Sequence, residues 1–167
     1  MIQKYVYGKP FSTEAVVTEV PAGEGTPAYG KVDTEKGFCF TYIMEETDIV
    51  YGLGEANRGL NKRGYCYISD CTDDPNHTED KRSLYGAHNF IVVSGRETFG
   101  LFFDYPSAMT FDIGYTKMDT LQVSCADADL NLFVIEGDSP YDIVKQFRKI
   151  IGRSYIPPKY AFGFGQS

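Results

Sequence analysis

The chain has 167 residues, of which 43% are hydrophobic and 23% charged, enough to bury one core and too few for several domains. Twelve Phe, thirteen Tyr, seventeen Gly and no Trp favour a turn-rich β protein over a helical bundle. A net charge of −7 argues against nucleic acid or an anionic membrane surface as a partner, because both attract positively charged proteins.

The sequence contains no recognisable targeting signal and no cysteine motif. Residues 1–10 contain no apolar stretch of signal-peptide length, and no run of roughly 18 apolar residues predicts a membrane span. The cysteines are too few and too irregularly spaced for a disulfide framework or a zinc site, so we expect free thiols in a cytoplasmic protein. No cofactor or metal is expected, because there is no phosphate-loop motif and neither histidine has a Cys or His at zinc-like spacing. The four cysteines are Cys39, Cys66, Cys71 and Cys125, and only Cys66 and Cys71 are considered for a bridge.

Short runs rich in β-branched and aromatic residues alternate with turn residues along the chain. Because no helix is expected between them, they predict an antiparallel β-sandwich rather than β-α-β units. The short loop at residues 94–97 makes residues 89–103 a predicted hairpin. The expected strands are residues 14–20, 37–43, 89–93, 98–103, 107–113 and 130–136.

One amphipathic helix is expected late in the chain. Ser139 followed by Pro140 is typical of an N-cap with proline in the first turn, and Gly152 ends the pattern after about three turns. We expect its apolar face to dock on the sheet. That face is predicted to consist of Tyr141, Val144, Phe147 and Ile151.

A polar stretch at residues 56–88 is too long for an ordinary connection, and long polar loops on a rigid scaffold are often functional. Asp70, Asp73 and Asp74 fall together within it. Such a cluster can bind Ca²⁺, accept hydrogen bonds from sugar hydroxyls, or stay solvated while capping nearby backbone amides. Calcium is disfavoured because the alternating oxygen ligands and the turn glycine are missing.

The last residues read as the start of another unit. Residues 155–160 resemble a linker, and residues 161–167 begin an apolar strand that is not completed. We therefore expect residues 1–154 to form the sandwich domain and residues 155–167 to lead into a following domain.

Three segments together resemble landmarks of the family 31 glycoside hydrolases, the α-glucosidase family. Gly100–Asp104 with Ser107–Met109 resembles the family's following strands, and Gly137–Arg153 resembles the helix that leads into its barrel. The resemblance covers roughly the last two thirds of the chain. The three landmarks are Tyr51-Gly52-Leu53-Gly54-Glu55, Leu84-Tyr85-Gly86-Ala87-His88-Asn89-Phe90 and Pro157 to Ser167, in the family's order and spacing.

The resemblance implies a galactose-mutarotase-like sandwich that precedes a (β/α)₈ barrel, with Ala161 opening the first barrel strand. It also implies retaining hydrolysis of terminal α-linked glucose from oligosaccharides. The two aspartates that perform this chemistry would lie on the barrel beyond Ser167, so no catalytic residue is expected in this fragment, which should be inactive alone.

A substrate-binding residue is implied as well. In the family, a loop from the sandwich reaches over the barrel mouth, where an Asp in an N-x-D-x-P-like stretch binds hydroxyls of the non-reducing-end sugar. Residues 71–75 match with Asp73 in the Asp position, although Cys71 stands where Asn is common. If the register is shifted, Asp74 or Asp70 takes this role. We interpret Tyr85 and Phe90 as core residues without chemistry.

Two other functions fit a sandwich. A free-standing carbohydrate-binding module would offer exposed aromatic platforms, and the lack of Trp weakens this interpretation. An aldose epimerase would need a His and a Glu in one cleft, whereas His77 and His88 are the only histidines. If the barrel is removed, the end of the fragment exposes Tyr160, Phe162 and Phe164, so we expect self-association into a homo-oligomer or poor solubility.

Overall fold

The computed structural model describes residues 1–163, which fold into two five-stranded sheets, an α-helix and a 3₁₀ helix. Sheet A has the strand order β1-β10-β7-β6-β4, and each of its neighbouring pairs is antiparallel. Its strands are β1 (Ile2–Tyr7), β4 (Ile49–Gly54), β6 (Ala87–Ser94), β7 (Thr98–Asp104) and β10 (Leu130–Glu136).

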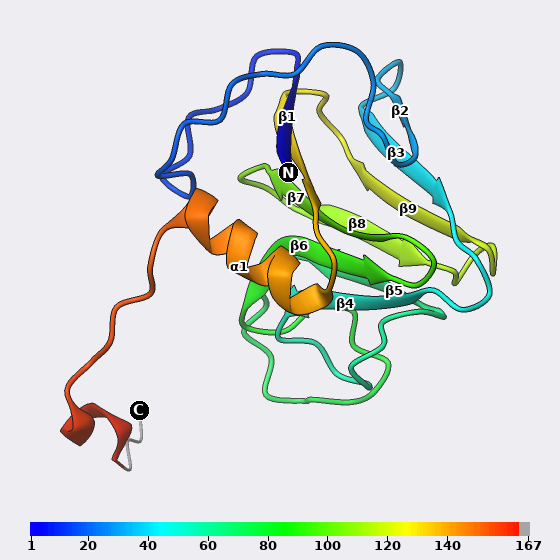
Figure 1. Ribbon diagram of the computed structural model, residues 1–167. Helices are drawn as coiled ribbons and strands as arrows, with labels where there is room; N and C mark the ends of the chain where they lie inside the picture. The colour runs from blue at the N-terminus through cyan, green and yellow to red at the C-terminus, as the bar shows by residue number, and fades with distance from the viewer. Residues whose placement is uncertain (164–167) are drawn as a thin grey trace.

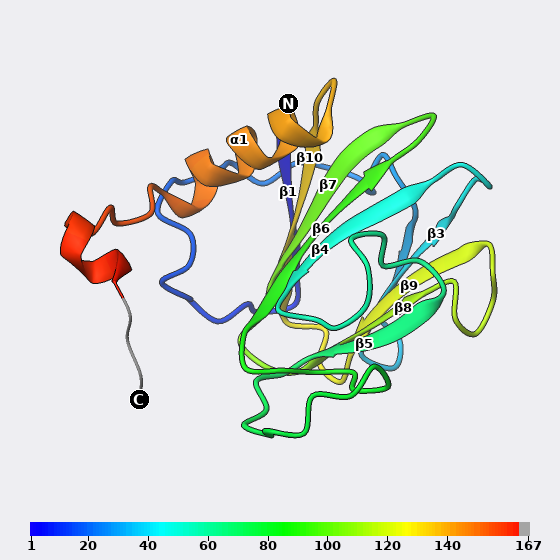
Figure 2. The same ribbon diagram turned by 90° about the horizontal axis from the view of Figure 1, so that it is seen from below.

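Sheet B has the order β2-β3-β9-β8-β5 and is likewise antiparallel throughout. The two sheets lie face to face, which confirms the predicted β-sandwich (Figures 1 and 2). The strands of sheet B are β2 (Lys31–Asp33), β3 (Phe38–Ile43), β5 (Tyr65–Ser69), β8 (Met109–Ile113) and β9 (Thr120–Cys125).

Aromatic side chains fill the space between the sheets. Phe103 of β7 is completely buried. It meets Phe38, Phe40 and Phe111 of sheet B edge to face, at ring-centre distances of 5.9, 6.0 and 5.8 Å. Such rings bury roughly 150–250 Å² each and prefer this geometry. The aromatic composition noted in the sequence therefore stabilises the contact between the two sheets.

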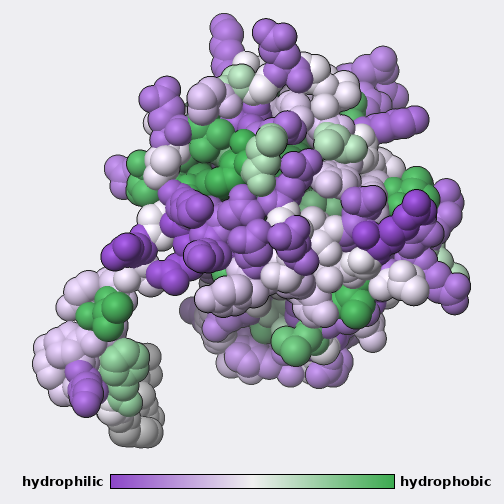
Figure 3. Space-filling view, in the orientation of Figure 1, coloured by the Kyte–Doolittle hydropathy of each residue, from purple (hydrophilic) through white to green (hydrophobic). Residues whose placement is uncertain are grey.

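The outer face of sheet A is covered by helix α1 (Pro140–Ile151), as Figure 2 shows. The N-cap prediction is confirmed, because Ser139 Oγ accepts a hydrogen bond from the Asp142 amide at 3.2 Å. Phe147 stacks on Phe90 of β6 with ring centres 3.9 Å apart. Sheet A is thus buried on both sides, whereas the outward surface of the helix is hydrophilic (Figure 3).

The predicted apolar face of this helix was wrong in part. Phe147 is buried and Ile151 partly buried, but Tyr141 is 79% exposed and Val144 is 42% exposed. The buried side chains are Ile143, Phe147 and Ile150, whose spacing of four and three residues follows the 3.6-residue period. Tyr141 and Val144 also lie at helical spacing from Phe147 and Ile151, so the sequence pattern does not distinguish the docked face from its neighbour.

Residues 10–20, here called the strap, cross over sheet A, and the strand expected at residues 14–20 does not form. The amides of Val17 and Thr18 donate instead to the Ile150 carbonyl, and Thr18 Oγ1 donates to the Lys149 carbonyl. These bonds satisfy carbonyls that a helix leaves free at its C-terminal end. Two amides in the middle of the expected strand therefore cap α1 and do not pair with a neighbouring strand.

The other five expected strands are confirmed as β3, β6, β7, β8 and β10, and the hairpin of β6 and β7 is confirmed as well. Strands β1, β2, β4, β5 and β9 were not predicted. In β4 the glycines gave a turn signal, and the strand is indeed irregular, with a register shift between Gly52 and Gly54. A side chain at Gly52 would lie 2.2 Å from the Phe90 carbonyl, so only glycine fits.

The chain leaves the sandwich after α1 as a tail that extends away from the body (Figure 1). Ala161 and Phe162 lie in a 3₁₀ helix, Lys159–Phe162, and not in a strand. The remainder of the expected strand, residues 164–167, lies outside the described residues. Tyr155, Ile156, Tyr160 and Phe162 are exposed. Within residues 1–163 no helix has the length and apolarity needed to cross a membrane.

The helix face can be tested by truncating one side chain on each side of it. Because Ile143 is completely buried, we expect Ile143→Ala to lower the free energy of unfolding by about 2–5 kcal/mol. Tyr141→Ala removes a larger but exposed side chain and should change it by less than about 0.5 kcal/mol. Urea denaturation measures both, and an equal effect of the two substitutions would contradict the described helix face.

Candidate functional site

The polar stretch singled out in the sequence forms two irregular segments at one edge of the sandwich. Residues 55–64 connect β4 to β5, and residues 70–86, here called the acidic loop, connect β5 to β6. Each segment passes from one sheet to the other, and the acidic loop protrudes beyond the sheets in Figure 2. The long loop predicted from the sequence is therefore present and surface-exposed.

Hydrogen bonds between its two limbs close the acidic loop. The Thr72 amide donates to the Leu84 carbonyl at 2.8 Å, and the Thr72 and Ser83 hydroxyls lie 2.7 Å apart. At its base, the Ile68 amide donates to the Arg82 carbonyl at 2.9 Å. These contacts hold the start of the loop, near Thr72, against its end, near Ser83 and Leu84.

Asp74 holds the loop together from within. One carboxylate oxygen forms an ion pair with Lys81, and the other accepts a hydrogen bond from the Asn76 amide at 2.9 Å. The hydrogen bond from Lys81 and that from Asn76 hold the pKa of the Asp74 carboxyl below its ordinary value. Both oxygens are thus engaged in contacts inside the loop.

Asp73 lies in a different environment, although it is adjacent in sequence. Its side chain is exposed. It lies beside the Tyr85 hydroxyl, whose pKa is raised first by desolvation, then by the charge of Asp73 and by a hydrogen bond to that carboxylate. Tyr85 itself is 45% exposed, so the interpretation of Tyr85 as a core residue was wrong.

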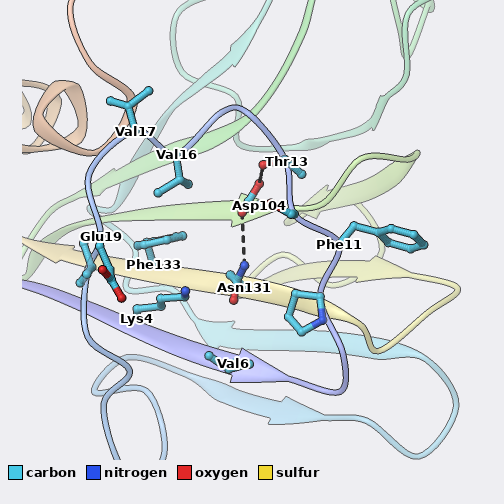
Figure 4. A pocket seen from close by; sticks show the side chains of 13 residues that line it. Lys4, Val6, Phe11, Thr13, Val16, Val17, Glu19, Asp104, Asn131 and Phe133 are labelled. Atoms are coloured by element: carbon cyan, nitrogen blue, oxygen red, sulfur yellow. Dashed lines mark hydrogen bonds between the residues drawn. The ribbon is translucent and has the colours of Figure 1, made fainter.

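Asp70 lies at the base of the loop, where it and Cys71 line a groove of about 870 Å³. His88 and Asn89 of β6 contribute to the same groove. A second cavity, of about 550 Å³, lies under the strap (Figure 4). The three aspartates of the cluster therefore differ: Asp74 is bonded to Lys81 within the loop, Asp73 is exposed at its surface beside Tyr85, and Asp70 borders a groove.

The strap cavity has a structural explanation. Buried Asp104, 5% exposed, accepts hydrogen bonds from Thr13 of the strap and from Asn131 of β10. Figure 4 shows Thr13 above Asp104 and Asn131 below it, with a dashed line between Asn131 and Asp104. Thr13 and Asp104 line both cavities, so the strap crosses between them at this point. We assign the buried carboxylate to anchoring the strap.

Two of the sequence landmarks meet at the inner end of the acidic loop. The Glu55 amide donates to the Gly86 carbonyl at 3.0 Å, and the Gly86 amide donates to Glu55 Oε2 at 2.8 Å. Gly54 pairs with Ala87 between β4 and β6. The interpretation of these landmarks as turns and close backbone packing agrees with the structure.

Sequence analysis missed two residues that bind the loop from outside. Asn57 and Arg58 belong to the neighbouring segment, and their side chains donate to the carbonyls of Thr78 and Glu79. Nothing in the sequence linked positions 21 residues apart. The only signal was the polar character of residues 56–63.

The remaining candidate residues stand apart from each other. His77 meets Tyr85 edge to face, at a ring-centre distance of 5.4 Å, whereas His88 lies in β6. The four cysteines are free thiols, Cys66 being buried in β5 and Cys71 exposed in the loop. Among the described residues, no three His, Cys, Asp or Glu side chains are grouped in a way that could hold a metal ion.

Comparison with known protein families decides the assignment. Residues 9–112 match the model of the glycosyl hydrolase 31 N-terminal galactose mutarotase-like domain. The chain belongs to this family. The match includes the strap, both landmarks described above and the whole acidic loop.

Members with similar sequences include two α-glucosidases. Alpha-glucosidase 2 of Bacillus thermoamyloliquefaciens is 34% identical over 80% of this chain, and an alpha-glucosidase of Saccharolobus solfataricus is 28% identical over 98% of it. The chain spans only 18% and 24% of the length of these curated relatives.

A solved structure of the same family supports the fold. The family 31 dextranase of Flavobacterium johnsoniae, complexed with isomaltotriose, superposes with a TM-score of 0.73 at 25% identity. The match covers 80% of this chain and 16% of the dextranase. The expected galactose-mutarotase-like sandwich is thus confirmed.

The ion pair between Lys81 and Asp74 predicts how the stability of the acidic loop changes at low pH. Because the pKa of Asp74 is lowered in the folded loop, its stabilising effect is complete above about pH 4 and is lost as the pH falls through the lowered value. In Lys81→Ala, we expect the Asp74 pKa to rise toward the ordinary value near 3.8. Carboxyl-detected NMR titration measures this, and an unchanged Asp74 pKa in Lys81→Ala would show that the ion pair does not stabilise the loop.

Proposed function

We propose that this chain is the N-terminal sandwich domain of a retaining α-glucosidase that removes terminal α-linked glucose from oligosaccharides. The family match over residues 9–112 and the two α-glucosidase relatives support this proposal. The observation that carries it is the exposed Asp73 carboxylate on a closed loop, at the position where the family resemblance implies a sugar-binding aspartate.

The division of the chain follows from this proposal. Residues 1–154 form the sandwich domain, and residues 155–167 lead into a catalytic (β/α)₈ barrel. The exposed apolar side chains of Tyr155, Ile156 and Phe162 on a tail that leaves the body support it, because a following domain would cover them. The catalytic aspartates belong to the barrel, and the isolated chain is inactive.

Asp73 accepts hydrogen bonds from hydroxyls of the non-reducing-end sugar. A carboxylate that accepts two hydroxyls forms two charge-assisted bonds, each contributing about 1.5–3 kcal/mol. Asp74 is less suited to this role, since Lys81 and the Asn76 amide occupy its oxygens. Asp70 is the remaining alternative, because it borders the groove at the base of the loop.

We also infer a cytoplasmic location and self-association of the isolated chain. The free thiols of Cys39, Cys66, Cys71 and Cys125 are consistent with a reducing compartment. The exposed apolar tail favours association between copies when no barrel covers it. Light scattering of residues 1–167 at increasing concentration tests the second inference, and a monodisperse monomer at high concentration would contradict it.

The sugar-binding role is tested by aspartate substitutions in the full-length gene product that contains this chain. With p-nitrophenyl α-glucoside, Asp73→Asn should raise KM at least about tenfold with little change in kcat, because it weakens binding equally in ground and transition states. Asp70→Asn tests the alternative position, and it should leave KM within about twofold if Asp73 holds the role. A large rise in Asp70→Asn and none in Asp73→Asn would assign the role to Asp70 instead.

A further inference from the structure

Two consecutive side chains of the segment that precedes β5 donate hydrogen bonds to the acidic loop. Asn57 Nδ2 donates to the Thr78 carbonyl at 2.6 Å, and Arg58 Nε donates to the Glu79 carbonyl at 2.7 Å. Thr78 and Glu79 lie in the outer part of the loop, away from the strands that anchor its ends. These two bonds therefore hold a region that the sheets do not reach.

Aromatic rings fix the guanidinium that makes the second bond. The Arg58 guanidinium carbon lies 3.8 Å from the centre of the Tyr65 ring and 5.7 Å from that of the Tyr67 ring. Both tyrosines belong to β5, where residues two apart share one face. A planar guanidinium stacks on such rings, which an ammonium does less well. Arg58 is therefore held by a rigid strand on one side while it binds the loop on the other.

The buried tyrosine adds a second reason for an arginine at this point. The Tyr67 hydroxyl is buried, and among the described residues it has no hydrogen-bond partner of normal geometry. Burial raises the pKa of this hydroxyl, and the neighbouring Arg58 guanidinium opposes the rise. Arg58 thus lies close to a polar group that would otherwise be isolated in the core.

The backbone at this position is unusual. Arg58 has φ +77°, in the left-handed region that residues with a side chain rarely adopt. Such conformations persist where the surrounding contacts hold them, and they are found often at functional sites. Here the held conformation directs the side chain between β5 and the acidic loop.

Further contacts within the loop connect the Arg58–Glu79 hydrogen bond to the position of Asp73. Lys81, two residues after Glu79, pairs with Asp74, and Thr72 is tied to Ser83 and Leu84. Asp73 lies between Thr72 and Asp74, both of which are fixed to the limb that Arg58 holds. The backbone that carries its carboxylate is consequently held from both sides by contacts of its neighbours.

We propose that Arg58 is a positioning residue for the sugar-binding Asp73, acting through the Glu79 carbonyl and the Lys81–Asp74 pair. The inference rests on the proposed function, because it concerns the same loop. Arg58 does not contact the sugar. It reduces the number of conformations open to the loop before substrate binds, and pre-organisation of this kind raises affinity.

The test compares variants of the full-length gene product on p-nitrophenyl α-glucoside. Arg58→Gly removes the guanidinium while allowing φ +77° without strain. We expect KM to rise roughly tenfold and kcat to change little, since a displaced loop weakens ground-state and transition-state binding alike. Arg96→Gly, in the exposed turn between β6 and β7, is the matched control and should leave KM unchanged. Arg58→Lys keeps the charge and should not restore KM, because it lacks the planar group.

A double variant distinguishes positioning from a general effect on the fold. If Arg58 acts through Asp73, then Arg58→Gly with Asp73→Asn should have the KM of Asp73→Asn alone. Hydrogen exchange by mass spectrometry should show faster exchange of amides at residues 74–81 in Arg58→Gly and unchanged exchange in β7. If Arg58→Gly does not fold, Asn57→Ala removes the Thr78 bond and should raise KM less, in the same direction.

The outcomes separate this inference from the proposed function. If Asp73→Asn raises KM while Arg58→Gly has wild-type KM or unchanged loop exchange, the positioning role is wrong and the sugar-binding role stands. Multiplicative effects in the double variant would likewise overturn it. If Asp73→Asn leaves KM unchanged, the sugar-binding role fails and the positioning role falls with it.

Discussion

Strands β7 and β10 must bury side chains on both of their faces. Phe103 and Leu132 point between the sheets, whereas Phe102 and Phe133 point outward, where water would otherwise meet them. Helix α1 covers this outer face, and the strap caps the C-terminal end of that helix through Val17 and Thr18. Sheet A therefore needs a cover on each face: sheet B covers its inner face, and α1 covers its outer face.

The location of the candidate site follows from the strand order. Strands β4 and β6 are neighbours at one edge of sheet A, and β5 is the edge strand of sheet B. The two polar segments that enter and leave β5 therefore cross between the sheets at the same edge of the sandwich. This topology brings Arg58 to Glu79 and Glu55 to Gly86, contacts that pair residues 21 and 31 positions apart. The rigid sandwich supplies the frame, and the acidic loop carries the exposed carboxylate.

Sequence reasoning predicted the fold class, the capped helix, five of the strands and the existence of a long acidic loop, because each leaves a local pattern. It failed where a tertiary partner decides the outcome. The strap looks like a strand, but its amides pair with helix carbonyls at Ile150. β4 looks like a turn, yet its glycines are needed for close approach to Phe90. The different environments of Asp73 and Asp74 depend on Lys81, and the role of Arg58 depends on β5, so neither could be predicted from spacing.

We propose that this chain contributes substrate binding to an α-glucosidase whose catalytic groups lie elsewhere. This proposal is tested by the hydrolysis of p-nitrophenyl α-glucoside by residues 1–167, measured beside the full-length gene product under the same conditions. We expect turnover by the longer protein and none by residues 1–167. Turnover by residues 1–167 would contradict it, since the catalytic pair would then lie within the sandwich, and inactivity of both proteins would favour a carbohydrate-binding module instead.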